Sequence, residues 1–150
     1  MVGDIYDSIR KEFVKALPEE IVRQRLIRHM IDSLGYPYEL IAVEKSLRQM
    51  PHMLLTDEDI PDRRADIICF VKGIQQGFDL YPLLMIECKS VKLTDKVISQ
   101  VVGYNYYVNA CFVAIANQDA IRLGWYDPIT KRYIFVDGLP RYDELVASLT

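Results

Sequence analysis

Apolar residues recur at helical spacing in one early segment of the chain. Residues 18–34 place apolar side chains three and four positions apart, which predicts a helix with one broad buried face. Pro18 suits the first position of a helix, and Gly35 followed by Pro37 ends the pattern. We therefore expect the first helix to span residues 18–34.

Four later segments are rich in apolar and β-branched residues over the length of a strand. They are residues 39–45, 65–72, 82–89 and 111–117. The second and third segments are apolar on both faces, which is typical of central strands covered by helices. A further helix is predicted for residues 94–108, with Thr94 as its N-cap.

A β-hairpin is expected near the end of the chain, where residues 121–126 and 131–136 flank a turn that contains proline. The sequence of residues 125–134 (WYDPITKRYI) is echoed in residues 5–14 (IYDSIRKEFV). This echo favours an extended arm or a hairpin for residues 5–14 over a helix, although apolar residues also occur there at helical spacing. Residues 46–63 are expected to form a loop insertion.

The predicted order is helix, three strands, helix, strand and then a hairpin. Helices separate some strands while the middle strands follow one another directly, which predicts a mixed sheet with helices on both faces. The fold class is therefore α/β, a three-layer α-β-α sandwich. A chain of 150 residues is expected to form a single domain spanning residues 1–150.

The composition is that of an ordinary globular protein, about half apolar and about one quarter charged. No apolar run is long enough to span a bilayer, and early charges argue against a signal peptide, so we expect a cytoplasmic protein without membrane contact. Cys69, Cys88 and Cys111 lie in apolar runs without the spacing of metal ligands. Reduced thiols in strands are the expectation for them.

The net charge of −3 bears on nucleic-acid binding. A protein that holds DNA by itself usually presents a basic surface, because neutralising phosphates supplies much of the affinity. Either the basic residues of this chain cluster locally, or another subunit supplies the grip on DNA.

Charged residues end the apolar strand predicted for 82–89. Side chains alternate along a strand, so Glu87 and Lys89 share one face. If the hairpin that joins the strands predicted for residues 65–72 and 82–89 is symmetric about Gln76 and Gly77, Asp66 lies opposite Glu87, with Cβ atoms roughly 5 Å apart. The sequence thus brings two carboxylates and a lysine together on the sheet.

Two carboxylates so close repel each other unless a cation lies between them. Mg²⁺ fits this place, because it takes one or two carboxylates, keeps several waters and accepts substrate phosphate as a further ligand. Lys89 is placed to orient an attacking water or to stabilise charge on the phosphate. From geometry alone, the alternative is a surface ion cluster of Asp66, Glu87 and Lys89 at a sheet edge.

Four ordered motifs resemble the PD-(D/E)XK nuclease superfamily, and more closely the nuclease domain at the N-terminus of type I restriction enzyme R subunits. They are Pro18–Gln24 (PEEIVRQ), Arg64–Ile67 (RADI), Ile86–Lys89 (IECK) and Gln100–Tyr104 (QVVGY). The resemblance implies a restriction-endonuclease-like fold with an α-β-β-β-α-β core, to which this chain adds the C-terminal β-hairpin.

The resemblance also implies catalytic roles. Asp66 and Glu87 would bind Mg²⁺, for which Mn²⁺ can substitute, and the backbone carbonyl of Cys88 would be a further ligand. Lys89 would position the nucleophile. Asp66, Glu87 and Lys89 are therefore the expected catalytic residues.

Auxiliary roles follow from the same resemblance. A glutamate of the first helix, Glu19 or Glu20, would support the metal or its waters, and the sequence does not choose between them. Gln100 and Tyr104 lie four residues apart on one helical face, so both are placed to reach the site or the DNA backbone. Arg23, which points toward the sheet like the two glutamates, is a further candidate for contact with phosphate.

Two functional hypotheses stay open. The first is a Mg²⁺-dependent DNA endonuclease domain, related to type I restriction, that hydrolyses phosphodiester bonds with metal-activated water. The second is a nuclease-fold binding or assembly module with little or no cleavage activity, which acts with another restriction-modification or repair subunit. The chain lacks a Gly-x-x-x-x-Gly-Lys-[Ser/Thr] loop, so no ATP site is expected in it. A basic rim around the carboxylates would favour the first hypothesis, and an acidic or occluded rim the second.

Overall fold

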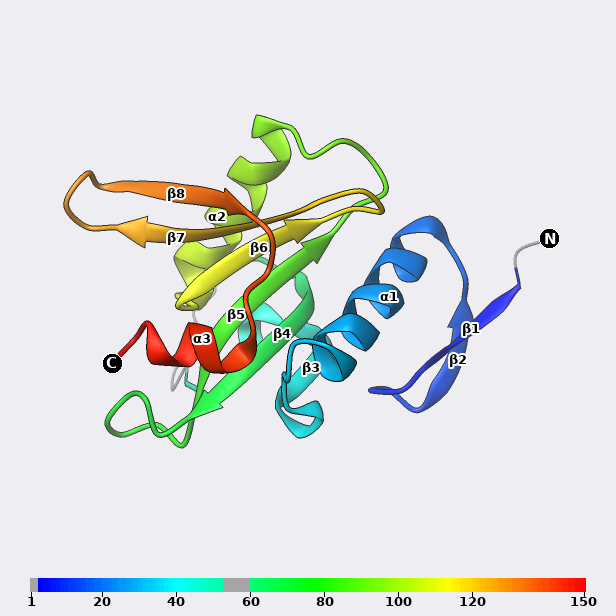
Figure 1. Ribbon diagram of the computed structural model, residues 1–150, viewed down its shortest axis with the longest axis horizontal. Helices are drawn as coiled ribbons and strands as arrows, with labels where there is room; N and C mark the ends of the chain where they lie inside the picture. The colour runs from blue at the N-terminus through cyan, green and yellow to red at the C-terminus, as the bar shows by residue number, and fades with distance from the viewer. Residues whose placement is uncertain (1–2, 53–59) are drawn as a thin grey trace.

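The computed structural model describes residues 3–52 and 60–150. In these residues two sheets and three α-helices form (Figure 1). The strands are β1 (Asp4–Asp7), β2 (Glu12–Lys15), β3 (Ile41–Ser46), β4 (Arg64–Lys72), β5 (Leu80–Cys88), β6 (Phe112–Ala116), β7 (Ile121–Asp127) and β8 (Arg132–Asp137). The helices are α1 (Pro18–Asp32), α2 (Asp95–Val108) and α3 (Tyr142–Ala147), with 3₁₀ turns at Tyr38–Leu40 and Leu47–Gln49.

The main sheet has six strands in the order β3-β4-β5-β6-β7-β8. Strands β5 and β6 are parallel, and α2 makes the crossover between them, while the other neighbouring pairs are antiparallel. The predicted α/β class and mixed sheet are confirmed. Strands β1 and β2 form a separate two-stranded sheet beside α1 (Figure 1).

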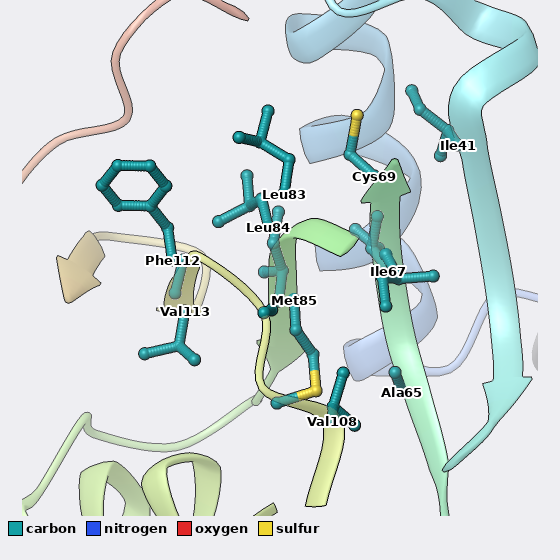
Figure 2. Close-up of a cluster of buried hydrophobic side chains, with 14 of the residues drawn as sticks. Ile41, Ala65, Ile67, Cys69, Leu83, Leu84, Met85, Val108, Phe112 and Val113 are labelled. Carbon is teal, nitrogen blue, oxygen red and sulfur yellow. The ribbon is translucent and has the colours of Figure 1, made fainter. Parts of the chain in front are cut away.

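Helices cover both faces of the main sheet. Cys88 and Ala116 line cavities together with residues of α1, whereas their neighbours along the strands point the other way. On that other face, Met85 extends toward Val108 at the end of α2 (Figure 2). The short helix α3 lies on the α1 face, where Leu145 lines a groove with Phe112. The sheet interior is therefore shielded from water on both sides, as its apolar strands require.

The register of β4 and β5 depends on a β-bulge. Next to the turn, Lys72 pairs with Leu80, which displaces the hairpin from the symmetric turn that the sequence predicts. The register then shifts between Cys69 and Phe70, and beyond this bulge Ile67 pairs with Ile86. The expected register is thus confirmed at the site end of the hairpin, although the turn that was to produce it is different.

The echo between the two ends of the chain reflects one turn used twice. In each hairpin the backbone carbonyl of an aspartate accepts a hydrogen bond from the amide of a lysine four residues later. The distances are 2.7 Å for Asp7 and 2.8 Å for Asp127. Both lysines, Lys11 and Lys131, adopt left-handed backbone angles, with φ of 57° and 59°. The prediction of an extended or hairpin structure for residues 5–14 is confirmed.

Some boundaries differ from the sequence predictions. Helix α1 ends at Asp32 rather than at residue 34, and residues 39–40 belong to a 3₁₀ turn rather than to a strand. The loop predicted for residues 46–63 includes a 3₁₀ turn, and its residues 53–59 lie outside the described part of the chain. Thr94 caps α2 as expected, because its hydroxyl accepts a hydrogen bond from the Val97 amide at 3.4 Å.

Helix α3 is absent from the sequence prediction. It is too short to give a periodic pattern, and contacts with distant residues hold it in place instead. The Tyr36 hydroxyl donates to the Pro140 carbonyl at 2.9 Å, and the Tyr142 amide donates to the Leu34 carbonyl at 2.9 Å. None of the described helices combines the length and apolarity that crossing a membrane requires.

The three cysteines are free thiols, as expected. Cys69 and Cys88 are buried in strands, and Cys111 is half-buried. Burial raises the pKa of Cys69 to about 12, so this thiol stays protonated at neutral pH.

Candidate functional site: a carboxylate pair at the end of the sheet

Asp66 and Glu87 meet where β4 and β5 begin to separate. The β4–β5 ladder ends at the pair of Ile67 and Ile86, one residue before them. Asp66 turns its carboxylate into the gap, where Oδ2 accepts the backbone N–H of Cys88 at 2.7 Å. Glu87 is only 7% exposed. The predicted adjacency is confirmed, and the burial of Glu87 argues against a cluster of surface charges.

Burial and mutual repulsion make it costly for both carboxylates of this pair to be ionised at once. Burial raises the pKa of Glu87 well above its ordinary value, and the neighbouring Asp66 carboxylate raises it further. Lys89 acts in the opposite direction, since its positive charge favours the ionised glutamate. A cation held between the two carboxylates would relieve the same repulsion.

Lys89 follows directly after β5 and is half-buried. Its backbone amide donates to the Ala116 carbonyl at 2.8 Å, which ties the end of β5 to β6. Among the described residues no carboxylate forms an ion pair with the Lys89 ammonium. The side chain is therefore available to a bound group beside Glu87.

Helix α1 brings a buried arginine to the same place from the opposite face of the sheet. Arg23 is 6% exposed, and its guanidinium lies 3.7 Å from Asp66 Oδ1 and 3.4 Å from the Asp66 carbonyl. Two bonds of 2.7 Å join it to Glu20, three residues earlier on the helix. Arg23 is thus placed to hold Asp66, and it also lines the cavity beside the pair. Its contact with phosphate stays a prediction.

The two candidate glutamates of α1 differ in their surroundings. Glu20 is buried and accepts hydrogen bonds on both oxygens from Arg10, Arg23 and Gln24. Burial alone would raise the pKa of Glu20, but these bonds outweigh it and lower the pKa to about 2. Glu19 is exposed and lines the cavity beside the pair. Glu20 therefore orders the site, and Glu19 is the glutamate that faces solvent there.

Glu44 is a site residue that the sequence analysis missed. It lies on β3 opposite Asp66, where the β3–β4 ladder skips one pair between Val43 and Lys45. Its φ of 52° is left-handed, which is unusual for glutamate within a strand. This turn of the backbone directs the carboxylate to Arg23, at 3.1 Å. The residue pattern of the strand does not predict such a kink.

The β1–β2 hairpin supplies the other missed residues. Arg10 bonds to Asp7 and reaches Glu20 at 2.6 Å, with Glu44 at 3.6 Å. Asp7 is fully buried. Together with α1 and the ends of β4 and β5, the hairpin encloses a cavity of about 500 Å³ that Asp66 and Cys88 line.

The remaining predicted site residues, Gln100 and Tyr104, lie on α2. Tyr104 is half-buried, and the Arg63 guanidinium lies 5.7 Å from the centre of its ring, a cation–π distance. Since Arg63 precedes β4, this contact places Tyr104 near the start of the strand that carries Asp66. Gln100 is exposed on α2, and its side chain makes no hydrogen bond within residues 3–52 and 60–150.

The donors fit a hard divalent ion with few protein ligands. Across the described ranges no group of three or more His, Cys, Asp or Glu side chains is arranged to hold a metal. Mg²⁺ commonly uses only one or two carboxylates and completes its octahedron with water and substrate phosphate. The buried Glu87 carboxylate and the partly exposed Asp66 carboxylate, which repel each other, match that requirement.

Comparison with protein families assigns residues 18–140 to the family described as type I restriction enzyme R protein N terminus (HSDR_N). The chain belongs to this family. Comparison of the chain with the curated proteins and with the solved structures found no match.

Membership in the type I restriction enzyme R protein N-terminal family gives the chain a restriction-related role. Asp66, Glu87 and Lys89 all fall inside the matched residues, as do α1 and α2. The β1–β2 hairpin falls outside them. The wider PD-(D/E)XK superfamily assignment and the individual roles of the site residues stay predictions.

Proposed function

We propose that this chain is a Mg²⁺-dependent DNA endonuclease domain of the type I restriction family. The observation that carries the proposal is the buried Glu87 carboxylate beside Asp66, in a family of restriction enzyme R proteins. Asp66, Glu87 and the carbonyl of Cys88 would hold Mg²⁺, or Mn²⁺ in its place. The bound ion would activate water and neutralise phosphate charge.

The residues of the chain have separate tasks in this reaction. Arg23 holds the Asp66 carboxylate from beneath, and the Cys88 amide fixes one of its oxygens. Lys89, beside Glu87, orients the attacking water or stabilises charge on the phosphate. Glu19 is exposed in the cavity and would support the metal or its waters. Gln100 and Tyr104 would contact the DNA backbone.

The rim of the site is mixed in charge. Arg63, Arg64 and Lys15 are exposed near the cavity, but so are Glu19 and the partly exposed Glu44. Such a rim gives the isolated chain a weak grip on phosphates, in line with its net charge of −3. This supports a second candidate function, a binding or assembly module that acts with another restriction-modification subunit.

Plasmid cleavage in the presence of Mg²⁺ or Mn²⁺ tests the first function. Asp66→Asn, Glu87→Gln and Lys89→Met should each lower the cleavage rate by on the order of 100-fold or more. Asp66→Asn keeps an acceptor for the Cys88 amide, so the fold should persist. Asp62→Asn and Lys92→Met, at exposed positions nearby, are matched controls and should cleave like the unmodified chain.

Retained cleavage in the three site variants would exclude this catalytic centre. An unmodified chain that neither cleaves DNA nor binds Mn²⁺ by calorimetry, yet co-purifies with another restriction subunit, would instead support the assembly module.

A further inference from the structure

The β1–β2 hairpin reaches the proposed metal site through a continuous series of charged contacts. Arg10, in the hairpin turn, bonds to Glu20 of α1 at 2.6 Å. Glu20 bonds to Arg23, and the Arg23 guanidinium lies 3.7 Å from Asp66. The last member, Asp66, accepts the Cys88 amide at 2.7 Å. A single line of contacts therefore joins the hairpin to the carboxylate pair.

We propose that Arg10 is a positioning residue for the Asp66 carboxylate. This inference rests on the proposed function in one respect, namely that Asp66 is a metal ligand. Arg10 touches neither carboxylate of the pair and acts through Glu20 and Arg23. The hairpin that carries it lies outside the residues matched by the restriction family, so family membership does not assign it a part in the site.

The charges along this line explain why an arginine is needed. Glu20 and Glu44 both lie against Arg23, and one guanidinium cannot compensate two carboxylates and Asp66 as well. Arg10 contributes a further positive charge to Glu20 and, at 3.6 Å, to Glu44. The exposed Arg64 also approaches Glu44, at 3.8 Å. Apart from Arg10, Glu20 has no arginine partner besides Arg23 among the described residues. Without Arg10, Glu20 would depend on Arg23 alone for positive charge and would draw its guanidinium away from Asp66.

Asp7 fixes the geometry of Arg10. It is fully buried and accepts the Ile9 and Arg10 amides at 2.8 and 3.1 Å as well as the Arg10 side chain. The planar guanidinium can contact Asp7 and Glu20 at the same time, which a lysine ammonium at the end of a flexible chain does poorly. The hairpin turn thus presents Arg10 in one orientation.

The backbone amide of Cys88 gives a direct test that needs neither metal nor DNA. Because this amide donates to Asp66, its ¹H–¹⁵N resonance reports where the Asp66 carboxylate lies. Arg10→Gln should displace the Cys88 resonance, and Arg10→Lys should displace it less. Lys11→Asn, in the same turn, removes an equal charge and keeps a residue that tolerates left-handed angles, so it should leave the resonance in place.

Mn²⁺ affinity provides the second measurement. Arg10→Gln should weaken Mn²⁺ binding by about 10-fold or more, as removal of an outer partner of a metal ligand usually does. Arg10→Gln that lowers the melting temperature but leaves both the Cys88 resonance and Mn²⁺ affinity unchanged would overturn the inference. If the unmodified chain binds no Mn²⁺, the proposed function fails, and the Cys88 resonance alone still decides the role of Arg10.

Discussion

Glu44 combines an unfavourable backbone with a favourable charge contact. A left-handed conformation costs a non-glycine residue roughly 1–2 kcal/mol, and here it interrupts the β3–β4 ladder. In return the side chain reaches Arg23 at 3.1 Å beside the carboxylate pair. Strain of this kind concentrates at functional sites, where the surrounding structure holds a residue in a conformation that it does not prefer.

Glu20 should make the stability of the protein depend on pH in acid. Its folded-state pKa of about 2 lies below the ordinary value of 4.5, because hydrogen bonds from arginines outweigh burial. Its stabilising contribution is therefore fully present above pH 4.5 and is lost as the pH falls toward 2. Glu20→Gln should lower the free energy of unfolding at pH 7 by on the order of 3 kcal/mol and flatten its slope between these values, as measured by urea unfolding.

Glu19→Gln is the matched control for this measurement. Glu19 is exposed, so its substitution should change the free energy of unfolding by less than about 0.5 kcal/mol and keep the acid slope. An equal slope in both variants would mean that the Glu20 cluster does not govern acid stability.

The two hairpins show one turn in two environments. Asp7 and Asp127 both accept a backbone amide two residues later, at 2.8 and 3.0 Å. Asp127 lies in an exposed turn at the end of the main sheet, whereas Asp7 is fully buried against Arg10. The local sequence thus sets the shape of the turn, and the surroundings decide what the turn contributes to the whole.

Alanine at the two aspartates should separate these contributions. Asp127→Ala should cost about 1 kcal/mol, the usual net value of a lost exposed turn bond. Asp7→Ala should cost about 3 kcal/mol or more, because it also breaks a buried ion pair. Chemical denaturation of both variants measures the loss in the free energy of unfolding. Equal losses would show that the ion pair of Asp7 with Arg10 does not stabilise the protein.

The sequence was sufficient for the order of elements along the chain, for a mixed sheet and for the carboxylate pair, but not for what surrounds the pair. Side-chain alternation along the strands and the short connection between them placed Asp66 beside Glu87, because both are features of the local sequence. Arg10 and Glu44 reach the site through a docked hairpin and a kinked strand, and neither leaves a local signal. Even the correct register rests on a bulge at Cys69 that the sequence did not reveal.

At the scale of the molecule, two tyrosines after α1 tie distant parts of the chain together. Tyr36, which is 2% exposed, donates its hydroxyl to Pro140 before α3 at 2.9 Å. Tyr38, which is 40% exposed, donates to Ser8 in the β1–β2 hairpin, also at 2.9 Å. The segment after α1 therefore anchors the C-terminal helix with one side chain and the N-terminal hairpin with the other.

Removing each hydroxyl should loosen a different end of the chain. Tyr36→Phe leaves a partly buried carbonyl without its partner and should cost about 1–2 kcal/mol, with faster amide hydrogen exchange in α3. Tyr38→Phe should cost less than 1 kcal/mol, with faster exchange confined to the hairpin. Exchange that rises at both ends in both variants would contradict separate anchoring.

The bulge between β4 and β5 has a consequence for how such domains can vary. It lies between the turn at residues 73–79 and the carboxylates, and it absorbs one residue of register. A loop that gains or loses one residue can thus be accommodated by forming or removing a bulge, while Asp66 and Glu87 keep their alignment. The chemistry at one end of the hairpin is in this way insulated from length changes at the other, which leaves that loop free to diverge.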